Sequence, residues 1–279
     1  MKQKIFVLFI ALAFVFSITT SAFAQSYSLE LTEEIVHVYW HADGTMSVDY
    51  SLHFKNNPDA HAIEFVDVVL PDTNYVISEV SADIDGQALN VDESYAGKGS
   101  GVAVDLGEYA IPAGENGIVH VTIGHIEHVL NPDNDADYAS AIFNTTWYGS
   151  EYITGDTDLT VVFHLPAGIP AEEIRAHLPS DNWGGTQEAE KSVDETGRVT
   201  YTWHDEKANG YTQYTFGASF PSSYIPLSTL IEPASKEITD FALSPVIYLP
   251  ILVVLVSILL IWLIYRKTSA NPDQASNQD

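Results

Sequence analysis

Three aspartates at alternate positions form the clearest candidate for metal chemistry. The segment NPDNDADYAS places Asp133, Asp135 and Asp137 in a D-x-D-x-D pattern, and carboxylates at alternate positions of a loop can converge on a hard cation such as calcium. An EF-hand loop starting at Asp133 would need glycine sixth and glutamate twelfth, where this chain has Tyr138 and Asn144. Calcium is therefore the candidate ion here, and a solvated linker is the alternative.

A second partial match to a calcium loop begins at Ser81. It supplies Asp83, Asp85 and Gly86, with Asp92 at the twelfth position. An Asp-Gly pair between two β-rich runs is better explained as a hairpin turn. We expect a turn at this place.

The ten histidines of the chain raise the question of zinc. His37 and His41 flank the predicted start of a hairpin, and HVTIGHIEH places His120 and His128 on one strand face with His125 opposite. A zinc site needs three or four ligands that converge in a tetrahedron. Because strand alternation divides this cluster between two faces, we expect ordinary half-exposed histidines.

Hydrolytic motifs are absent from the sequence. It contains no cysteine, no G-x-S-x-G, no H-E-x-x-H and no phosphate-binding loop. Glycosidases need only two carboxylates in a cleft, so the acid-rich composition keeps that class open. A sugar-binding surface could use tryptophans, but one per strand is more typical of a sandwich core; the tryptophans in question are Trp40, Trp147, Trp183 and Trp203.

The composition is strongly acidic. Lys and Arg number 11 against 38 Asp and Glu, which gives a formal net charge of −27. Such a surface repels phosphate backbones, so no nucleic acid is expected as a partner, whereas cations and basic surfaces are favoured electrostatically. The alternative is that the acidic residues only keep an exported protein soluble or suit a salty habitat.

Period-two alternation predicts the fold class. In DGTMSVDYSLHFK, apolar residues at Met46, Val48, Tyr50, Leu52 and Phe54 alternate with polar ones, which indicates a strand with one buried face. Similar runs recur after residues 118, 158, 198 and 213. We therefore predict a mainly β protein with two antiparallel, immunoglobulin-like β-sandwich domains and one C-terminal transmembrane helix.

The predicted domain boundaries follow changes in composition. We expect sandwiches over residues 25–130 and 141–221, an acidic linker over 131–140 and a proline-containing stalk over 222–244. One larger continuous sandwich is the alternative to two domains.

Both ends of the chain predict export and anchoring. Residues 1–24 have two lysines, an apolar run and an Ala22-Phe23-Ala24 end, as in a cleaved secretory signal; an uncleaved helix is the alternative. Residues 245–265 are long and apolar enough to span a bilayer. Because Arg266 and Lys267 follow directly, residues 266–279 should be cytoplasmic and the β-rich part extracellular in a single-pass cell-membrane protein.

Four segments together resemble a family of uncharacterised bacterial and archaeal membrane proteins that carry a β-rich exported domain of unknown function. These are HADGTMSVDYSLHF, ADIDGQAL, FNTTWYGSEYITGDTDLTVVFHLPAG and GRVTYTWHDEKANGYTQYTFGASFP, and the resemblance covers residues 29–221. It implies an exported β-rich domain on a membrane anchor and no catalytic residues. The tail RKTSANPDQASNQD departs from the longer, glycine-rich segment of many members.

Two functions remain open on these grounds. We expect a non-catalytic cell-surface protein for binding, adhesion or envelope organisation, whose partner is an envelope protein or glycan. The alternative is a membrane-tethered hydrolase that acts on envelope glycans or peptides. A pocket containing two acids, or a serine with a histidine and an acid, would favour the hydrolase.

Overall fold

Strict alternation of apolar and polar residues builds the centre of the fold. The computed structural model describes residues 27–95, 97 and 99–231. In β2 (Met46–Asn56), every second side chain from Met46 to Phe54 is buried, as the sequence predicts. The described residues are mainly β, with 51% in strands and 7% in short 3-10 helices, so the predicted fold class is confirmed at this level.

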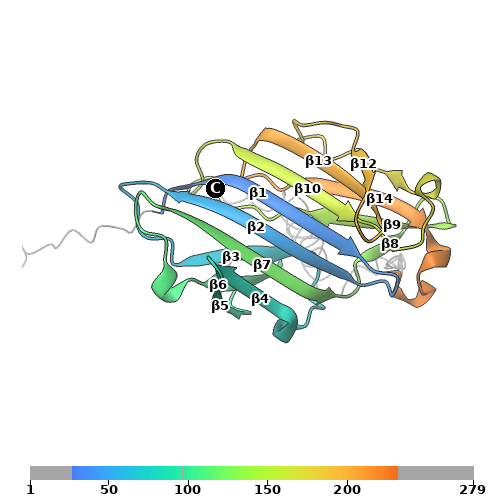
Figure 1. Ribbon diagram of the computed structural model, residues 1–279, viewed down its shortest axis with the longest axis horizontal. Helices are drawn as coiled ribbons and strands as arrows, with labels where there is room; N and C mark the ends of the chain where they lie inside the picture. The colour runs from blue at the N-terminus through green and yellow to red at the C-terminus, as the bar shows by residue number, and fades with distance from the viewer. Residues whose placement is uncertain (1–26, 96, 98, 232–279) are drawn as a thin grey trace, which may run out of the picture. The chain divides into compact units, whose positions relative to one another are not determined.

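The strands form two sheets, shown in Figure 1. The larger sheet has ten strands in the order β12-β13-β10-β1-β2-β7-β4-β5-β6-β3, and the smaller has four in the order β11-β14-β9-β8. Besides β2, the larger sheet contains β1 (Leu29–Trp40), β3 (Phe65–Leu70), β4 (Val80–Ile84), β5 (Gln87–Asp92), β6 (Ser100–Asp105), β7 (Asn116–Ile126), β10 (Thr157–His164), β12 (Glu190–Val193) and β13 (Val199–Ala208). The smaller contains β8 (Leu130–Pro132), β9 (Tyr138–Asn144), β11 (Arg175–Ala176) and β14 (Thr215–Pro221).

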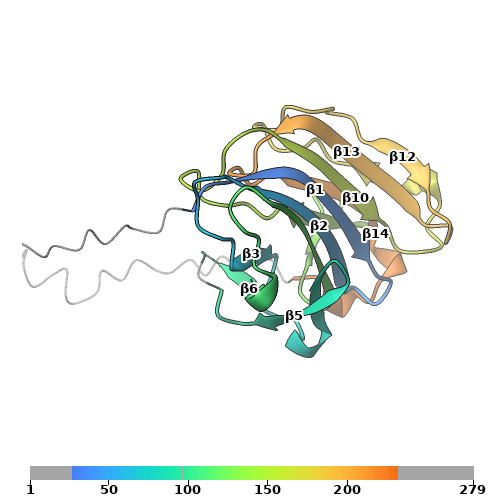
Figure 2. The same ribbon diagram turned by 60° about the vertical axis from the view of Figure 1, so that its left-hand side comes forward.

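Aromatic side chains join the two sheets into a sandwich. The rings of Trp203 on β13 and Phe216 on β14 have centroids 5.2 Å apart. Phe143 on β9 lies 6.4 Å from Tyr50 on β2 and 6.4 Å from Phe163 on β10. Figure 2 shows the strands of the larger sheet curving, with β3, β5 and β6 turned away from β13 and β12.

One parallel pairing corrects the predicted division into two sandwiches. β1 pairs with β10 in parallel, from Glu33 opposite Asp158 to Tyr39 opposite His164, whereas the other strand pairs of the two sheets are antiparallel. The two predicted domains thus share one sheet, and the described residues lie in a single compact unit. Alternation reveals which side chains face the core, but it does not identify the neighbouring strand.

The expected linker is part of the smaller sheet. Residues 131–140 include the end of β8 and the start of β9, which pair antiparallel with each other. Their polar character marks the turn between these two strands and does not separate two folding units.

The folded unit also extends into the predicted stalk. The 3-10 helices η4 (Ser222–Tyr224) and η5 (Leu227–Thr229) follow β14, and Ile225 between them is buried. The backbone N–H of Ile231 donates to the carbonyl of Leu130 at 2.9 Å. Residues 222–231 therefore pack against the sandwich.

The predicted hairpin turns are confirmed. Asp85 and Gly86 have φ values of 53° and 75° between β4 and β5, as a type I′ turn requires. Gly44, with φ of 87°, lies in the turn between β1 and β2. Asp83 accepts the backbone N–H of Gly86 at 3.0 Å, so this aspartate stabilises the turn.

Only short 3-10 helices are present in the described ranges; besides η4 and η5 these are η1 (Ile77–Glu79), η2 (Gly107–Tyr109) and η3 (Ala171–Glu173). No helix in this part of the chain has the length and apolar character to cross a membrane. The predicted signal (1–24) and the predicted span (245–265) lie outside the described residues.

The packing of residues 222–231 generates a prediction about folding. A fragment of residues 25–231 should fold cooperatively, and a shorter fragment of residues 25–221 should lose about 3 kcal/mol, because Ile225 and Leu230 no longer bury apolar surface. Urea unfolding followed by circular dichroism measures the difference. Replacing the exposed Leu227 by alanine in the longer fragment is the control and should change little; equal stability of the two fragments would contradict the assignment.

Candidate functional site

The predicted calcium ligands lie in and around the turn between β8 and β9. The carboxylate of Asp133 accepts the Ser219 hydroxyl and the backbone N–H of Asp135, the latter at 3.0 Å. The carboxylate of Asp135 pairs with the guanidinium of Arg175 at 3.0 Å, and that guanidinium also lies 3.7 Å over the ring of Tyr138. Among the described residues, no group of three His, Asp or Glu side chains is placed to hold a metal ion.

Asp133 also belongs to a serine, histidine and acid group. The Nε2 atom of His177 hydrogen-bonds the Ser219 hydroxyl, and it lies 3.8 Å from Asp133. In a hydrolytic triad the histidine accepts the serine proton, but here Ser219 donates to Asp133, which leaves the histidine as the donor. Since Ser219 is also buried, this group joins β14 to its neighbours and does not present a nucleophile.

Two histidines and an aspartate form a hydrogen-bonded chain that the sequence does not predict. We call this chain, made of His37, His164 and Asp194, the histidine relay. His37 on β1 and His164 on β10 are hydrogen-bonded at 2.9 Å through Nδ1 and Nε2, and His164 Nδ1 contacts Asp194 at 2.8 Å. Burial would raise the pKa of Asp194, but hydrogen bonds from Thr196 and His164 outweigh it and hold that pKa well below its usual range. The carboxylate therefore fixes the His164 tautomer, with the proton on Nδ1.

The other histidines considered for zinc do not join this relay in any contact of the described residues. His41 contacts the Ser47 hydroxyl at 2.9 Å, and His125 contacts Glu127 at 3.2 Å. Burial, followed by the nearby His164, lowers the pKa of His37, which favours a neutral ring at neutral pH. His37 is thus the neutral end of a hydrogen-bonded chain whose other end is the carboxylate of Asp194.

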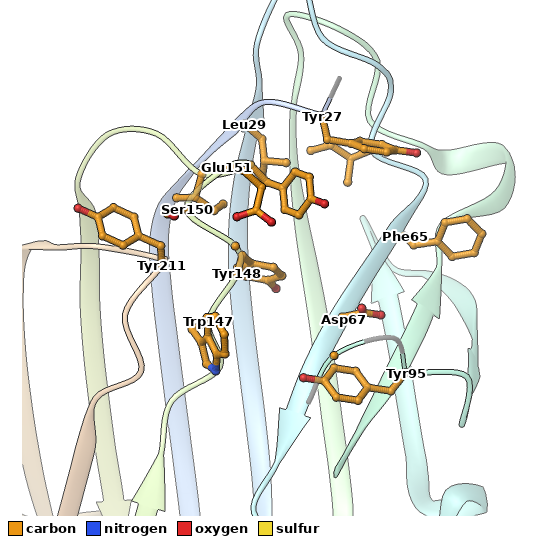
Figure 3. A pocket seen from close by; sticks show the side chains of 15 residues that line it. Tyr27, Leu29, Phe65, Asp67, Tyr95, Trp147, Tyr148, Ser150, Glu151 and Tyr211 are labelled. Carbon is orange, nitrogen blue, oxygen red and sulfur yellow. The ribbon is translucent and has the colours of Figure 1, made fainter. Parts of the chain in front are cut away.

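An open groove of about 880 Å³ is the strongest candidate binding site (Figure 3). One wall carries Trp147 and Tyr211, and the other carries Phe65, Asp67 and Tyr95, as Figure 3 shows. Tyr152 and the adjacent carboxylate of Glu151 also line the groove. We call this site, defined by these seven residues, the aromatic groove.

The aromatic groove gathers rings that are open to solvent. Five aromatic side chains are exposed in the described part of the chain, and four of them line this groove, namely Phe65 (58%), Trp147 (38%), Tyr152 (45%) and Tyr211 (45%). The fifth, Tyr109, lies elsewhere. Clustered exposed apolar surface is typical of interaction sites, whereas single exposed residues are ordinary.

The four tryptophans considered for a sugar-binding surface differ in their exposure to solvent. Trp40, Trp183 and Trp203 are buried, which confirms their predicted place in the core, but Trp147 is exposed on the groove wall. The missed signal lies in TTWYGSEYIT, residues 145–154, where aromatic residues occur without alternation between two alternating runs. Such a stretch indicates a segment that connects two strands and carries solvent-exposed aromatic rings.

Backbone hydrogen bonds fix this connecting segment between β9 and β10. Tyr148 donates its N–H to the carbonyl of Gly210 at 2.8 Å, beside Tyr211. The N–H of Leu29 donates to the carbonyl of Tyr152 at 2.8 Å, and the N–H groups of Tyr152 and Ile153 both donate to Gly149 in a tight turn. The rings are therefore presented on backbone held at several points.

The opposite wall comes from alternation along β3. Its residues Phe65 and Asp67 point away from the core, while Val66 and Val68 are buried. The N–H of Val69 donates to the hydroxyl of Thr146 at 3.1 Å, which links β3 to the connecting segment. A side chain at Gly101 would meet the ring of Tyr95 at 2.6 Å, so this glycine provides the space for that ring.

A buried acid on β1 acts electrostatically on one residue of the groove lining. A register irregularity between Leu31 and Glu33 of β1 changes which residues face inward, so that Glu34 is buried like Val36 and Val38. Burial raises the pKa of Glu34 to about 8. Glu34 in turn contributes to the raised pKa of Tyr148, a groove-lining residue whose hydroxyl is buried, although burial itself is the larger cause.

Comparison with known proteins gives only distant likenesses. No protein-family model and no curated protein matches the chain. An M1 zinc metallopeptidase from Deinococcus radiodurans is 13% identical over 68% of this chain and 42% of its own, with a TM-score of 0.41. Yeast LTA4 hydrolase in complex with bestatin is 10% identical over 73% of this chain and 31% of its own, with a TM-score of 0.39. These likenesses are too weak to extend either activity to this chain.

The buried Glu34 predicts how stability depends on pH. Above pH 4.5 the unfolded chain loses this proton, while the folded chain keeps it until about pH 8, so stability should fall across that interval. The total loss is roughly 5 kcal/mol. Glu34→Gln should remove this part of the pH dependence in urea unfolding of residues 25–231 between pH 5 and pH 8. The exposed Glu172→Gln is the control, and identical slopes in all three proteins would contradict the assignment.

Calcium binding by Asp133, Asp135 and Asp137 stays a prediction with its own test. A specific site would add about 2.7 kcal/mol at a hundredfold excess of calcium over Kd. Because Asp133 and Asp135 already have protein partners, we expect calcium and sodium at matched ionic strength to raise the melting temperature of residues 25–231 equally. A calcium-specific rise that disappears when all three aspartates become asparagine would instead establish the site.

Proposed function

We propose that this chain is a non-catalytic cell-surface protein that binds an envelope partner in the aromatic groove. The observation that carries this proposal is the gathering of Phe65, Trp147, Tyr152 and Tyr211 as exposed rings around one groove. Aromatic rings supply a large contact area at a small cost in side-chain entropy, and they dominate many binding surfaces.

The rigidity of the groove walls supports binding. One wall belongs to a sheet strand, and the other is fixed by backbone hydrogen bonds to Gly210 and Leu29. A site that is already formed loses little conformational entropy when its ligand arrives. The groove volume of about 880 Å³ also falls within the range of roughly 300–1,000 Å³ that is usual for ligand pockets.

The location at the cell surface belongs to the same proposal. Residues 1–24 would direct export, residues 245–265 would span the membrane once, and residues 266–279 would stay in the cytoplasm. The described residues that line the groove fall between residues 27 and 211, so the groove would lie outside the membrane. The formal net charge of −27 suits a soluble extracellular part.

The alternative function, a membrane-tethered hydrolase of envelope glycans or peptides, is favoured by one feature. Asp67 and Glu151 both line the groove, and a pair of carboxylates is the minimum that glycoside hydrolysis needs. Release of a cleaved product that is abolished by Asp67→Asn and by Glu151→Gln would favour this alternative over binding.

The experiment for the proposed function uses the full-length chain, purified in mild detergent, on an array of short peptides and oligosaccharides. We expect bound spots whose signal falls more than tenfold in a Trp147→Ala, Tyr211→Ala double variant, because buried aromatic contacts carry much of a binding energy. Tyr109→Ala removes an exposed ring away from the groove and should leave the signal unchanged. If no spot depends on Trp147 and Tyr211, the proposal is wrong.

A further inference from the structure

Glu34 has polar neighbours on the buried face of the larger sheet. It lies opposite Leu52 on β2 and opposite Leu159 on β10. Tyr50 and Thr157 each lie two residues from one of these partners, on the same buried face. Because strands are about 4.8 Å apart and rise about 3.3 Å per residue, the Cα atoms of such diagonal neighbours are about 8 Å apart, which long and aromatic side chains can span.

Tyr148 joins this group from the segment between β9 and β10. Its ring packs edge-on against Phe54 with centroids 5.7 Å apart, and Phe54 lies two residues after Leu52 on the buried face of β2. Tyr148 therefore reaches the position of Glu34 from one side, and Tyr50 reaches it from the other. In agreement with this proximity, the charge that Glu34 carries when ionised adds, after burial, to the raised pKa of both tyrosines.

The four side chains of this group carry buried polar atoms that lack hydrogen bonds. No partner among the described residues reaches the Oε1 atom of Glu34 or the hydroxyls of Tyr50, Tyr148 and Thr157, and these atoms are also closed to solvent. Burying a polar group without a partner costs free energy, and native proteins rarely leave one in that state. Four such groups around one position indicate that a polar ligand lies between them.

The charge of the group selects the kind of ligand. Among the described residues, burial alone raises the pKa of Glu34 to about 8, so its carboxyl is mostly protonated at neutral pH. All four groups are then neutral, and each can both donate and accept a hydrogen bond. An ion would find no opposite charge here, and an apolar molecule would leave the hydroxyls without partners. Water, with two donors and two acceptors, matches the group.

We propose that Glu34, Tyr50, Tyr148 and Thr157 form a binding site for water, in which at least one long-lived molecule is held between the two sheets. We call this site, defined by these four residues, the core hydration site. Polar groups that lie beyond direct hydrogen-bond distance are commonly bridged by water. A buried water makes about three hydrogen bonds, so four groups are enough for a full set.

The core hydration site shares one residue with the aromatic groove. Tyr148 lines the groove (Figure 3), whereas its hydroxyl belongs to the hydration site. A water molecule bonded to this hydroxyl would fix the orientation of the Tyr148 ring, since a satisfied polar network makes its members rigid. The hydration site goes beyond the proposed function, because it would exist whatever the groove binds.

The test counts long-lived buried waters in the full-length chain in detergent by oxygen-17 magnetic relaxation dispersion. Glu34→Met keeps much of the side-chain shape but removes the carboxyl, so the count should fall by at least one. Glu34→Gln keeps a donor and an acceptor at the same place and should keep the count. The control is Glu172→Met, at an exposed position, which should leave the count unchanged.

A triple variant provides the test if Glu34→Met does not fold. Tyr50→Phe, Tyr148→Phe and Thr157→Val together keep the shapes of the three side chains and remove their hydroxyls. Glu34 is then the single polar member of the site, which is fewer than the two to four partners that a buried water needs. The count should again fall by at least one. An unchanged count in every folded variant would overturn the proposal.

Two further measurements identify what occupies the site. A high-resolution crystal structure of the full-length chain should show a water molecule about 2.7–3.0 Å from the Glu34 carboxyl and from at least one of the three hydroxyls. A direct hydrogen bond between Glu34 and a hydroxyl, with no water beside them, would overturn the proposal. Loss of the infrared band of the protonated Glu34 carboxyl when sodium replaces choline at equal ionic strength would identify a bound cation instead of water.

Discussion

The parallel pairing of β1 with β10 is the contact on which the rest of this structure depends. It joins residues 33–39 to residues 158–164, more than a hundred positions along the chain. Each partner strand then pairs on its other edge, β1 with β2 and β10 with β13, so this contact lies in the interior of the ten-stranded sheet. Closing so long a loop costs entropy, and burial of the central strands offsets that cost.

The aromatic groove and the histidine relay both follow from this pairing. Because β10 lies beside β1, the segment that leads into β10 reaches the start of β1, where Leu29 binds Tyr152. The same register puts His164 opposite Tyr39, and from there its Nε2 atom reaches the Nδ1 atom of His37 at 2.9 Å. Two features with no proximity in the sequence are thus consequences of one strand alignment.

Local patterns in the sequence predict the faces of strands and the turns well. The buried face of β2, the turn at Asp85 and Gly86, and the buried positions of β7 and β13 all follow from period two and from residue type. These features depend on neighbours within a few residues. Strand pairing depends on long-range packing, and for this reason the sequence predicts two sandwiches, whereas strands from both halves lie in one ten-stranded sheet.

The groove could be predicted only in part. The alternating positions Phe65 and Asp67 indicate an outward pair on one strand, and residues 145–154 indicate a displayed aromatic segment. That these two stretches face each other depends on the curvature of the sheet and on the bond from Val69 to Thr146. The burial of Glu34 likewise depends on a register irregularity in β1, and no residue type in the sequence indicates that irregularity.

The two ends of the ten-stranded sheet bear on how this molecule avoids aggregation. An unpaired strand edge can recruit a second copy through its free backbone groups. β12 at one end is only four residues long, and its exposed side chains include Glu190 and Lys191. At the other end, Thr146 occupies the N–H of Val69 on β3. Both ends are therefore poor templates for edge-to-edge assembly. This would help the protein to stay free of aggregates at high local concentration.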